Sequence, residues 1–380
     1  MKCDNKDLYN IVCGLKGKLV SLYSLATWKN GLSFKNIDFS NYGKPVIKIS
    51  ELNNGISSST AYTNQDYDRD VYLTKGDLLF SWSGNPDTSI DVFRYTLQEG
   101  WLNQHIFKVT ENDKIILKDY LYYILKWLKP IFKEIARNKQ TTGLGHITVA
   151  DLKAIKIVVP DFAVQRKFIR VLKPIDDKIE LNNAINNNLQ QQAQACYVSM
   201  FIENADPTWK QGYLSDLITV KYGKDHKKLA DGVYPVYGSG GIMRYVERPI
   251  YDKESVLIPR KGTLNNVMYI NHPFWSVDTM FYTEMQMPNV AKFVYHFLKS
   301  KDLASMNAGS AVPSMTTDIL NSMEVVVPAE SALEEFEKLV APMYRAMQEN
   351  DNQSSTLVKL RDVLLSKLMS GELDVSEIDI

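Results

Sequence analysis

The sequence contains little cysteine, no surplus of charge of either sign and no long apolar run. Its three cysteines, Cys3, Cys13 and Cys196, are widely spaced, which predicts neither a disulfide framework nor a CxxC metal site and fits a reducing compartment. No stretch approaches the roughly 20 apolar residues of a membrane span, and the N-terminal MKCDNKDLYN carries charges where a signal peptide has an apolar segment. We therefore expect a cytoplasmic protein without membrane association.

The familiar signatures of catalysis are also missing from the sequence. There is no Gly-rich nucleotide loop of the GxGxxG or Walker type, no NPP[FY] motif of adenine methylation, and no acidic-X-Lys partner close behind Pro86 and Asp87 for a nuclease. The five histidines do not stand at HExxH or similar metal-ligand spacings. We predict a protein without catalytic residues, cofactor or metal.

An internal repeat organises the 380 residues, a length that suggests two or three domains. The segment HITVADLKAIKIVVP ends at Pro160, and SMTTDILNSMEVVVP ends at Pro328, 168 positions later. The same offset joins Pro174 to Pro342 and Leu189 to Leu357, so the register holds for about 40 residues. Upstream, the offset is 192, as between Gly31 and Gly223. These two offsets indicate a duplicated unit whose N-terminal part varies in length and whose C-terminal part is constant.

Each unit changes its periodicity once. Short β-rich runs punctuated by Gly, Asn and Pro fill about 19–160 and 212–328, with one helical segment in each, at 119–136 and 289–306. After each IVVP or VVVP run, apolar residues recur at steps of four and three, which predicts a helix of about 40 residues with a heptad seam. An exposed apolar stripe on each helix favours packing of the two helices on each other.

We expect this packing to be antiparallel, because two equal units are then related by a pseudo-two-fold axis. The seam carries Asn182 and Asn186 in the first helix and Asn350 and Ser354 in the second. In an antiparallel pair the helix middles meet, so that facing amides fix the register. Alternatively, these positions are hydrated and flank a gap.

The predicted fold is therefore α+β, with two pseudo-repeated globular domains separated by two long helices that form an antiparallel coiled coil. The predicted boundaries are 1–160 for the first domain, 161–206 for the first helical spacer, 207–328 for the second domain, and 329–380 for the second spacer and tail.

Several strings within these segments resemble the specificity subunits of type I restriction-modification systems over nearly the whole chain. KGDLLFSWSGNPDTS and GWLNQHIFKV at 75–109 are similar to the first target-recognition domain of that family. YPVYGSGGI, VLIPRKGTLNNV and FWSVDTMFY at 234–282 are similar to the second, and LVKLRDVLLSKLMSGELDV at 357–375 resembles the family's C-terminal helix and tail. Residues 1–15 depart from the pattern as an unusual lead-in. The resemblance implies that each domain reads half of a bipartite sequence in double-stranded DNA, while the helices hold the halves apart and dock two methyltransferase subunits, with restriction subunits joining the complex.

With equal numbers of acidic and basic residues, 44 each, DNA binding must come from local patches. Lysines would mainly contact phosphates, whereas Arg, Asn and Gln can read base edges. The candidate DNA-binding residues are Arg94, Arg137, Lys139, Gln140 and His146 in the first domain, and Lys224, His226, Lys227, Lys228, Arg260, Lys261, Asn265 and Asn266 in the second. The alternative interpretation of each residue is a solvated charge in a loop that contacts no DNA. Trp82, at a strand end, either stacks against DNA or belongs to the core. The sequence assigns no clear role to the pair Gln104 and His105.

Two other functions stay open at this point. One is a coiled-coil scaffold whose globular domains bind protein or glycan, which would lack the linear fall of log affinity with log salt that phosphate contacts cause. The other is a self-sufficient enzyme that cleaves or methylates DNA, which the missing motifs disfavour.

Overall fold

The computed structural model describes residues 15–57, 60–140, 143–306 and 314–375. The lead-in at 1–14, with Cys3 and Cys13, lies outside these ranges. The chain divides into two compact units. Unit 1 comprises 1–181 and 353–380, and unit 2 comprises 182–352. Each unit is described by itself.

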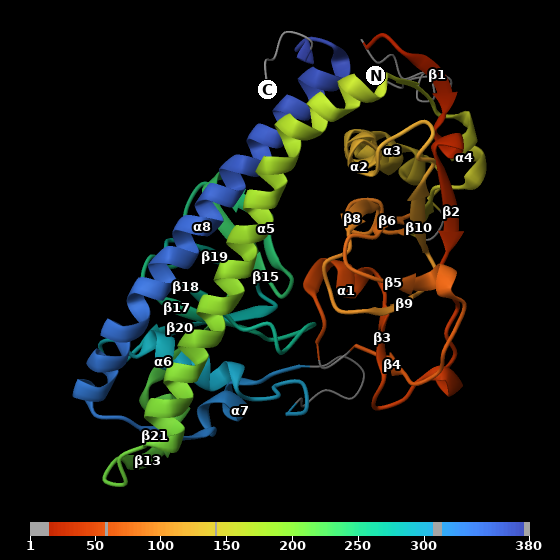
Figure 1. The fold of residues 1–380 in the computed structure, drawn as a ribbon. Helices are drawn as coiled ribbons and strands as arrows, with labels where there is room; N and C mark the ends of the chain where they lie inside the picture. Colours follow the sequence, from red (N-terminus) through yellow and green to blue (C-terminus); the bar gives the residue numbers. More distant parts are fainter. Residues whose placement is uncertain (1–14, 58–59, 141–142, 307–313, 376–380) are drawn as a thin grey trace. The chain divides into compact units, whose positions relative to one another are not determined.

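Unit 1 contains one globular part and one end of each long helix. Its strands are β1 (Lys18–Ser21), β2 (Ala26–Asn30), β3 (Lys44–Ile47), β4 (Tyr62–Thr63), β5 (Tyr72–Leu73), β6 (Leu78–Ser81), β7 (Ser83–Gly84), β8 (Asp91–Arg94), β9 (Gly100–Leu102), β10 (Ile106–Glu111), β11 (Gly145–His146) and β12 (Lys156–Val159). Its short helices are α1 (Ile49–Asn54), α2 (Lys118–Trp127), α3 (Lys129–Asn138) and α4 (Val149–Ala154). Two four-stranded sheets have the orders β2-β10-β6-β8 and β4-β3-β9-β5, and β1 pairs with β12. Helices α2 and α3 lie beside the first sheet (Figure 1), and residues of both helices share its buried apolar core.

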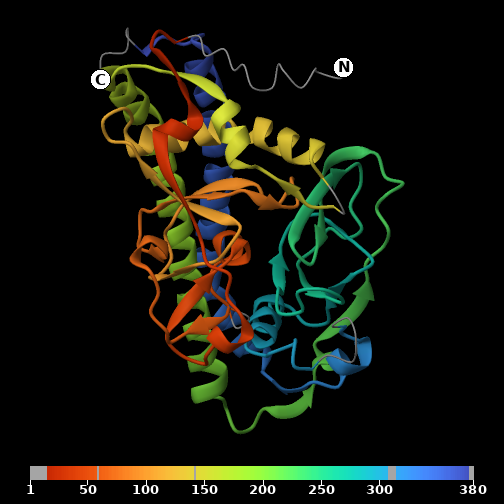
Figure 2. The same cartoon turned by 90° about the vertical axis from the view of Figure 1, so that its right-hand side faces the viewer.

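Unit 2 repeats this plan with fewer elements. Its strands, green to cyan in Figure 2, are β13 (Lys210–Tyr213), β14 (Ile218–Tyr222), β15 (Asp231–Gly238), β16 (Gly241–Val246), β17 (Ser255–Pro259), β18 (Met268–Ile270), β19 (Trp275–Ser276) and β20 (Met280–Met285), followed by β21 (Glu324–Val327) in blue. Its short helices are α6 (Ala291–Lys299) and α7 (Thr317–Asn321). The order β14-β20-β17-β18 copies the first sheet of unit 1, and the β13–β21 pair copies β1–β12.

The 168-residue offset has a structural counterpart at a helix start in each unit. The side chain of Thr148 accepts a hydrogen bond from Asp151 N and caps α4. The side chain of Thr316, 168 positions later, accepts one from Ile319 N and caps α7. Because a capping hydroxyl satisfies an otherwise unpaired N–H group, the repeat preserves residues that fix local structure.

The two helical segments predicted inside the domains differ from the observed ones. The segment 119–136 forms two helices, α2 and α3, which meet at Leu128. Pro130 stands in the first turn of α3, where its missing N–H cannot continue the hydrogen bonds of α2. In unit 2, α6 already ends at Lys299.

The long helices are α5 (Phe162–Val198) and α8 (Glu330–Ser370), of 37 and 41 residues. A π-helical turn, Ser199–Glu203, follows α5. The predicted seam residues Phe168 and Leu172 in unit 1 and Phe336 and Val340 in unit 2 are fully buried. Further along the helices the predicted seam is half-buried, as at Ile179 and Met347.

Contacts between α5 and α8 run in antiparallel order within unit 2. Asn182 Nδ2 donates to the carbonyl of Asn350, and Asn186 Nδ2 donates to the carbonyl of Met347. Asn350 Nδ2 in turn donates to Asn186 Oδ1 at 2.8 Å. The amides predicted to meet in mid-helix do meet, and they bond to each other.

Candidate nucleic-acid interface

Two basic segments of unit 2 come together at one end of the sheet. Strands β14 and β17 both pair antiparallel with β20, so they run parallel to each other and end at the same side. Tyr222 is the last residue of β14, and Arg260 directly follows β17. The guanidinium of Arg260 lies 5.3 Å from the centre of the Tyr222 ring. Strand pairing thus joins 221–228 to 259–266, which are 31 or more residues apart in the chain.

The two segments carry four exposed lysines: Lys224, Lys227, Lys228 and Lys261. Within the described ranges none of them has an ion-pair partner. The backbone of Lys224 is held in place, because its N–H donates to Ser276 O at 2.8 Å and its carbonyl accepts from Trp275 Nε1 at 2.9 Å. His226 is half-buried, and its Nδ1 has no hydrogen-bond partner among the described residues. The lysine charges are therefore available to an anion.

The two asparagines of the second segment bond within the protein. Asn265 Nδ2 donates to Asp302 Oδ1 at 2.9 Å, and its Oδ1 accepts from Ala304 N at 3.0 Å. Asn266 Nδ2 donates to the carbonyl of Ser239, in the turn between β15 and β16. Gly262 has a φ of 86°, and a Cβ there would lie 2.8 Å from Ser239 Oγ. These contacts hold the loop that carries Arg260; contact of either asparagine with DNA stays a prediction.

Unit 1 presents Trp82 at the position that Arg260 occupies in unit 2. Trp82 N donates to His105 O at 3.1 Å, and Arg260 N donates to Thr279 O at 2.9 Å. Asn30 pairs with Phe107 across the sheet, as Tyr222 pairs with Phe281. The side chains repeat the relation as well, because Trp82 Nε1 donates to Asn30 Oδ1 at 2.9 Å.

Two histidines flank the half-buried Trp82. The ring of His105 lies 5.3 Å from the indole, and the ring of His146 lies 6.1 Å from it. His146 Nδ1 is 2.7 Å from Ser83 Oγ. Burial, together with nearby His146, lowers the pKa of His105. The sequence predicts His146 as a DNA-binding residue and leaves Trp82 open between DNA stacking and the core; the left-handed φ of 74° at His105 depends on the fold.

The remaining candidates at the end of α3 are engaged in local contacts. Arg137 forms an ion pair with Asp87, and Gln140 Nε2 donates to Gly143 O at 2.6 Å. Lys139 Nζ lies 2.5 Å from Asp151 Oδ1, a carboxylate that is only 4% exposed. Arg137, Lys139 and Gln140 are exposed, so their polar ends remain open to solvent.

Arg94 has a different environment from the other candidates. Its side chain is 14% exposed, and it forms ion pairs with Asp119 at 2.9 Å and with Asp176 at 3.3 Å. Burial opposes its charge, but Tyr123, Tyr122 and Asp119 outweigh this effect and raise the pKa of Arg94 above its ordinary value. The guanidinium thus ties β8 and α2 to α5. This position lends no support to the predicted DNA contact, because a buried, paired cation does not face a ligand.

Comparison with known proteins identifies the class. The profile of the family described as type I restriction modification DNA specificity domain matches residues 17–191 and 207–339. The chain therefore belongs to this family and carries two copies of its domain. None of the helices among the described residues is long and apolar enough to cross a membrane.

Curated relatives agree with this assignment. The chain is 23% identical to the type I restriction enzyme MjaIX specificity subunit of Methanocaldococcus jannaschii, over 73% of each chain. It is 22% identical to the HindI specificity subunit of Haemophilus influenzae, over 79% of this chain and 87% of that one. A crystal structure of the type I S subunit from M. genitalium matches the fold with a TM-score of 0.50 and 19% identity, covering 94% of this chain and 99% of that one.

Proposed function

We propose that this chain is the DNA-specificity subunit of a type I restriction-modification complex, and that each globular domain reads one half of a bipartite site. The observation that carries the proposal is the duplicated strand-end position, which bears Trp82 in one unit and Arg260 in the other. A shared backbone with different side chains suits two domains that read different sequences. The domain boundaries 1–160 and 207–328 are part of this proposal.

In the second domain, Arg260 contacts a base and the lysines bind the phosphate backbone of the DNA. A guanidinium can bond bidentately to guanine O6 and N7, and the Tyr222 ring beneath it limits its motion. Lys224, Lys227, Lys228 and Lys261 are exposed cations that neutralise phosphates. Base discrimination and general affinity therefore reside in different residues of one surface.

In the first domain, Trp82 offers an apolar face to DNA. Its indole N–H is already bonded to Asn30, so stacking or wedging is the contact that remains to it. Arg137, Lys139 and Gln140 are exposed at the end of α3 and supply polar contacts.

We infer that α5 and α8 act as an antiparallel coiled-coil spacer that sets the distance between the half-sites. Half-sites about one DNA turn apart, roughly 34 Å between centres, would let both domains meet the same face of the duplex. Exposed apolar side chains outside the seam, Ile185, Leu339 and Leu360, favour docking of two methyltransferase subunits, one on each pseudo-symmetric half. Restriction subunits join this complex for cleavage, and the chain itself is non-catalytic.

The test is a map of methylated adenines in the source genome with and without this gene. We expect one motif to disappear on deletion, and we expect it to consist of two specified blocks around a fixed run of unspecified bases. An unchanged methylome, or the loss of a contiguous motif, contradicts the proposal.

A further inference from the structure

A basic cavity in unit 1 adjoins the strand-end surface described above and shares Arg137 with it. It has a volume of about 500 Å³ and lies between α2, α3 and the end of α8. Its lining contains five cationic side chains, Lys126, Lys129, Lys133, Arg137 and Arg361, and one carboxylate, Asp362. A lining of this kind attracts an anion.

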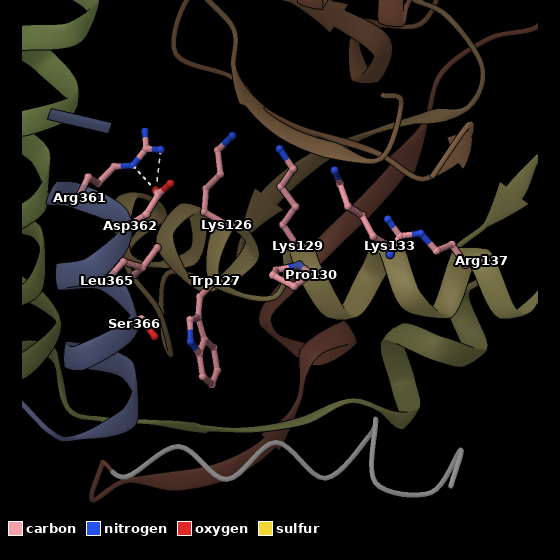
Figure 3. A pocket seen from close by; sticks show the side chains of 10 residues that line it. All are labelled: Lys126, Trp127, Lys129, Pro130, Lys133, Arg137, Arg361, Asp362, Leu365 and Ser366. Carbon is pink, nitrogen blue, oxygen red and sulfur yellow. Dashed lines mark hydrogen bonds and ion pairs between the residues drawn. The ribbon is translucent and has the colours of Figure 1, made fainter. Parts of the chain in front are cut away.

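Three basic residues of α3 form a row because of helix geometry. Lys129, Lys133 and Arg137 are four residues apart on α3, so they recur on one face about 6 Å apart along the axis. Figure 3 shows Lys126, Lys129 and Lys133 pointing to the same side, whereas Trp127 points away from them. The cationic face is thus extended along the helix rather than gathered around one point.

Internal carboxylates neutralise only part of this row. Asp91 pairs with both Lys126 and Lys129, at 3.0 and 2.5 Å, and Asp87 pairs with Arg137. Lys133 Nζ donates to the backbone carbonyl of Asp87 at 2.9 Å and has no carboxylate partner among the described residues. The three cations of the α3 row and the neighbouring Lys126 of α2 therefore face two carboxylates, Asp87 and Asp91. Because the Asp87 pair is half-exposed and of little net value, an incoming anion can replace it.

At its far end the row reaches the strand-end surface of the first domain. Arg137 lines the cavity, and His146 lies beside Trp82. The backbone of Gly145 approaches α3 so closely that a Cβ there would lie 2.2 Å from Ala136 O. An anion that extends from Trp82 along α3 would therefore meet Arg137 and Lys133 in turn, which fits a polymer of phosphates better than a single ion.

We propose that the α3 row, Lys129, Lys133 and Arg137, binds the sugar-phosphate backbone of the duplex that the first domain reads. This inference rests on the proposed function and extends it from base reading to a phosphate-tracking helix. Lys133 carries the clearest contribution, because no carboxylate in the described part of the chain pairs with its charge.

The experiment measures duplex affinity against salt concentration for the full-length chain, co-purified with its methyltransferase subunits. Lys133→Ala is compared with Lys133→Arg, which keeps the charge, and with Lys75→Ala. Lys75 is an exposed lysine before β6, at the opposite end of that strand from Trp82. We expect Lys133→Ala to lower the slope of log affinity against log salt by about one unit, with the same factor lost for every duplex sequence. Lys133→Arg and Lys75→Ala should retain the wild-type slope.

Two results overturn the inference. One is a slope of log affinity against log salt that is the same for Lys133→Ala and Lys75→Ala. The other is loss of methyltransferase co-purification with unchanged DNA binding, which would assign the cavity to a protein partner. Failure of the proposed function is a different result, because wild-type protein would then show equal affinity for all sequences, whatever the slope of Lys133→Ala.

Discussion

The two globular domains share a backbone plan but place different chemistry at the same point of it. A residue directly after the third strand in each main sheet is Trp82 in unit 1 and Arg260 in unit 2, and each bonds or stacks to the last residue of the first strand. One site offers a flat apolar ring between histidines, and the other a guanidinium in a segment pair that carries exposed lysines. The comparison teaches that the two units share the strand order of the sheet while the side chains at the strand end differ.

The same divergence occurs where the domains contact the long helices. Asp176 in α5 and Tyr344 in α8 are 168 positions apart and therefore equivalent. Asp176 accepts from Arg94, Arg361 and Tyr123, so unit 1 is fixed to its helices by buried charges. Tyr344 bonds to His296 Nε2 at 2.9 Å, and His296 Nδ1 lies 2.8 Å from Gln194 Oε1. This bonding chain is neutral, whereas the buried ion pair between α6 and α8 in unit 2, Lys292 with Glu337 at 2.8 Å, lies elsewhere. The equivalent positions Asp176 and Tyr344 should therefore respond differently to mutation.

The largest expected effect is a change of specificity. Replacing block 212–325 with the matching block of a relative should alter only the half-site that the second domain reads, because the helical segments that bracket it are kept. Methylome mapping of the chimera provides the measurement. A folded, active chimera in which both half-sites change would refute the assignment of one domain to one half-site.

Removing the carboxylate of Asp176 in unit 1 should lower the free energy of unfolding more than removing the hydroxyl of Tyr344 at the equivalent position in unit 2. Asp176→Asn leaves Arg94 and Arg361 buried without their shared carboxylate, which we expect to lower the free energy of unfolding by about 3–5 kcal/mol. Tyr344→Phe at the equivalent position removes one hydrogen bond to His296 and should cost about 1–3 kcal/mol. Urea unfolding of the two variants measures both values, and equal losses would contradict the distinction.

Acid should selectively weaken unit 2 through His296. Burial, with a smaller effect of Lys299, lowers the pKa of His296 to about 4, whereas an unfolded histidine has a pKa near 6.5. Between these values the unfolded chain binds a proton that the folded chain does not, so stability falls as pH falls from about 6.5 to 4, by a total on the order of 3 kcal/mol. His296→Gln should lack this part of the pH dependence. Unfolding curves at several pH values check it, and identical pH dependence in both proteins would contradict it.

The smallest effects should separate base reading from phosphate binding. Arg260→Ala should cost about 1–3 kcal/mol of discrimination at one base of the second half-site. Arg260→Lys keeps the charge but loses the fork of donors, so it should lose the same discrimination. Lys227→Ala should instead weaken binding to all sequences equally and lower the slope of log affinity against log salt by about one unit. Competition binding with single-base variants distinguishes these outcomes, and a sequence-dependent effect of Lys227→Ala would contradict the division of roles.

The sequence by itself determined the elements whose signals are local. The 168-residue offset, the strands such as β6 and β17, and the buried seam of α5 and α8 could be predicted because periodicity and repetition are properties of neighbouring residues. The break between α2 and α3 at Leu128 could also be predicted, because Pro130 stands in the sequence. The amphipathic pattern that runs through both helices instead favoured one continuous helix.

Only the tertiary structure decided which polar residues face solvent and which face one another. Arg94 reads as a candidate DNA contact in the sequence, yet Asp119 and the distant Asp176 bury and pair it. The equivalence of Trp82 and Arg260 has no counterpart in sequence identity, because it arises from hydrogen bonds to the neighbouring strand. Strand pairing joins residues far apart in the chain, and a single sequence encodes that pairing only through the sum of many weak preferences.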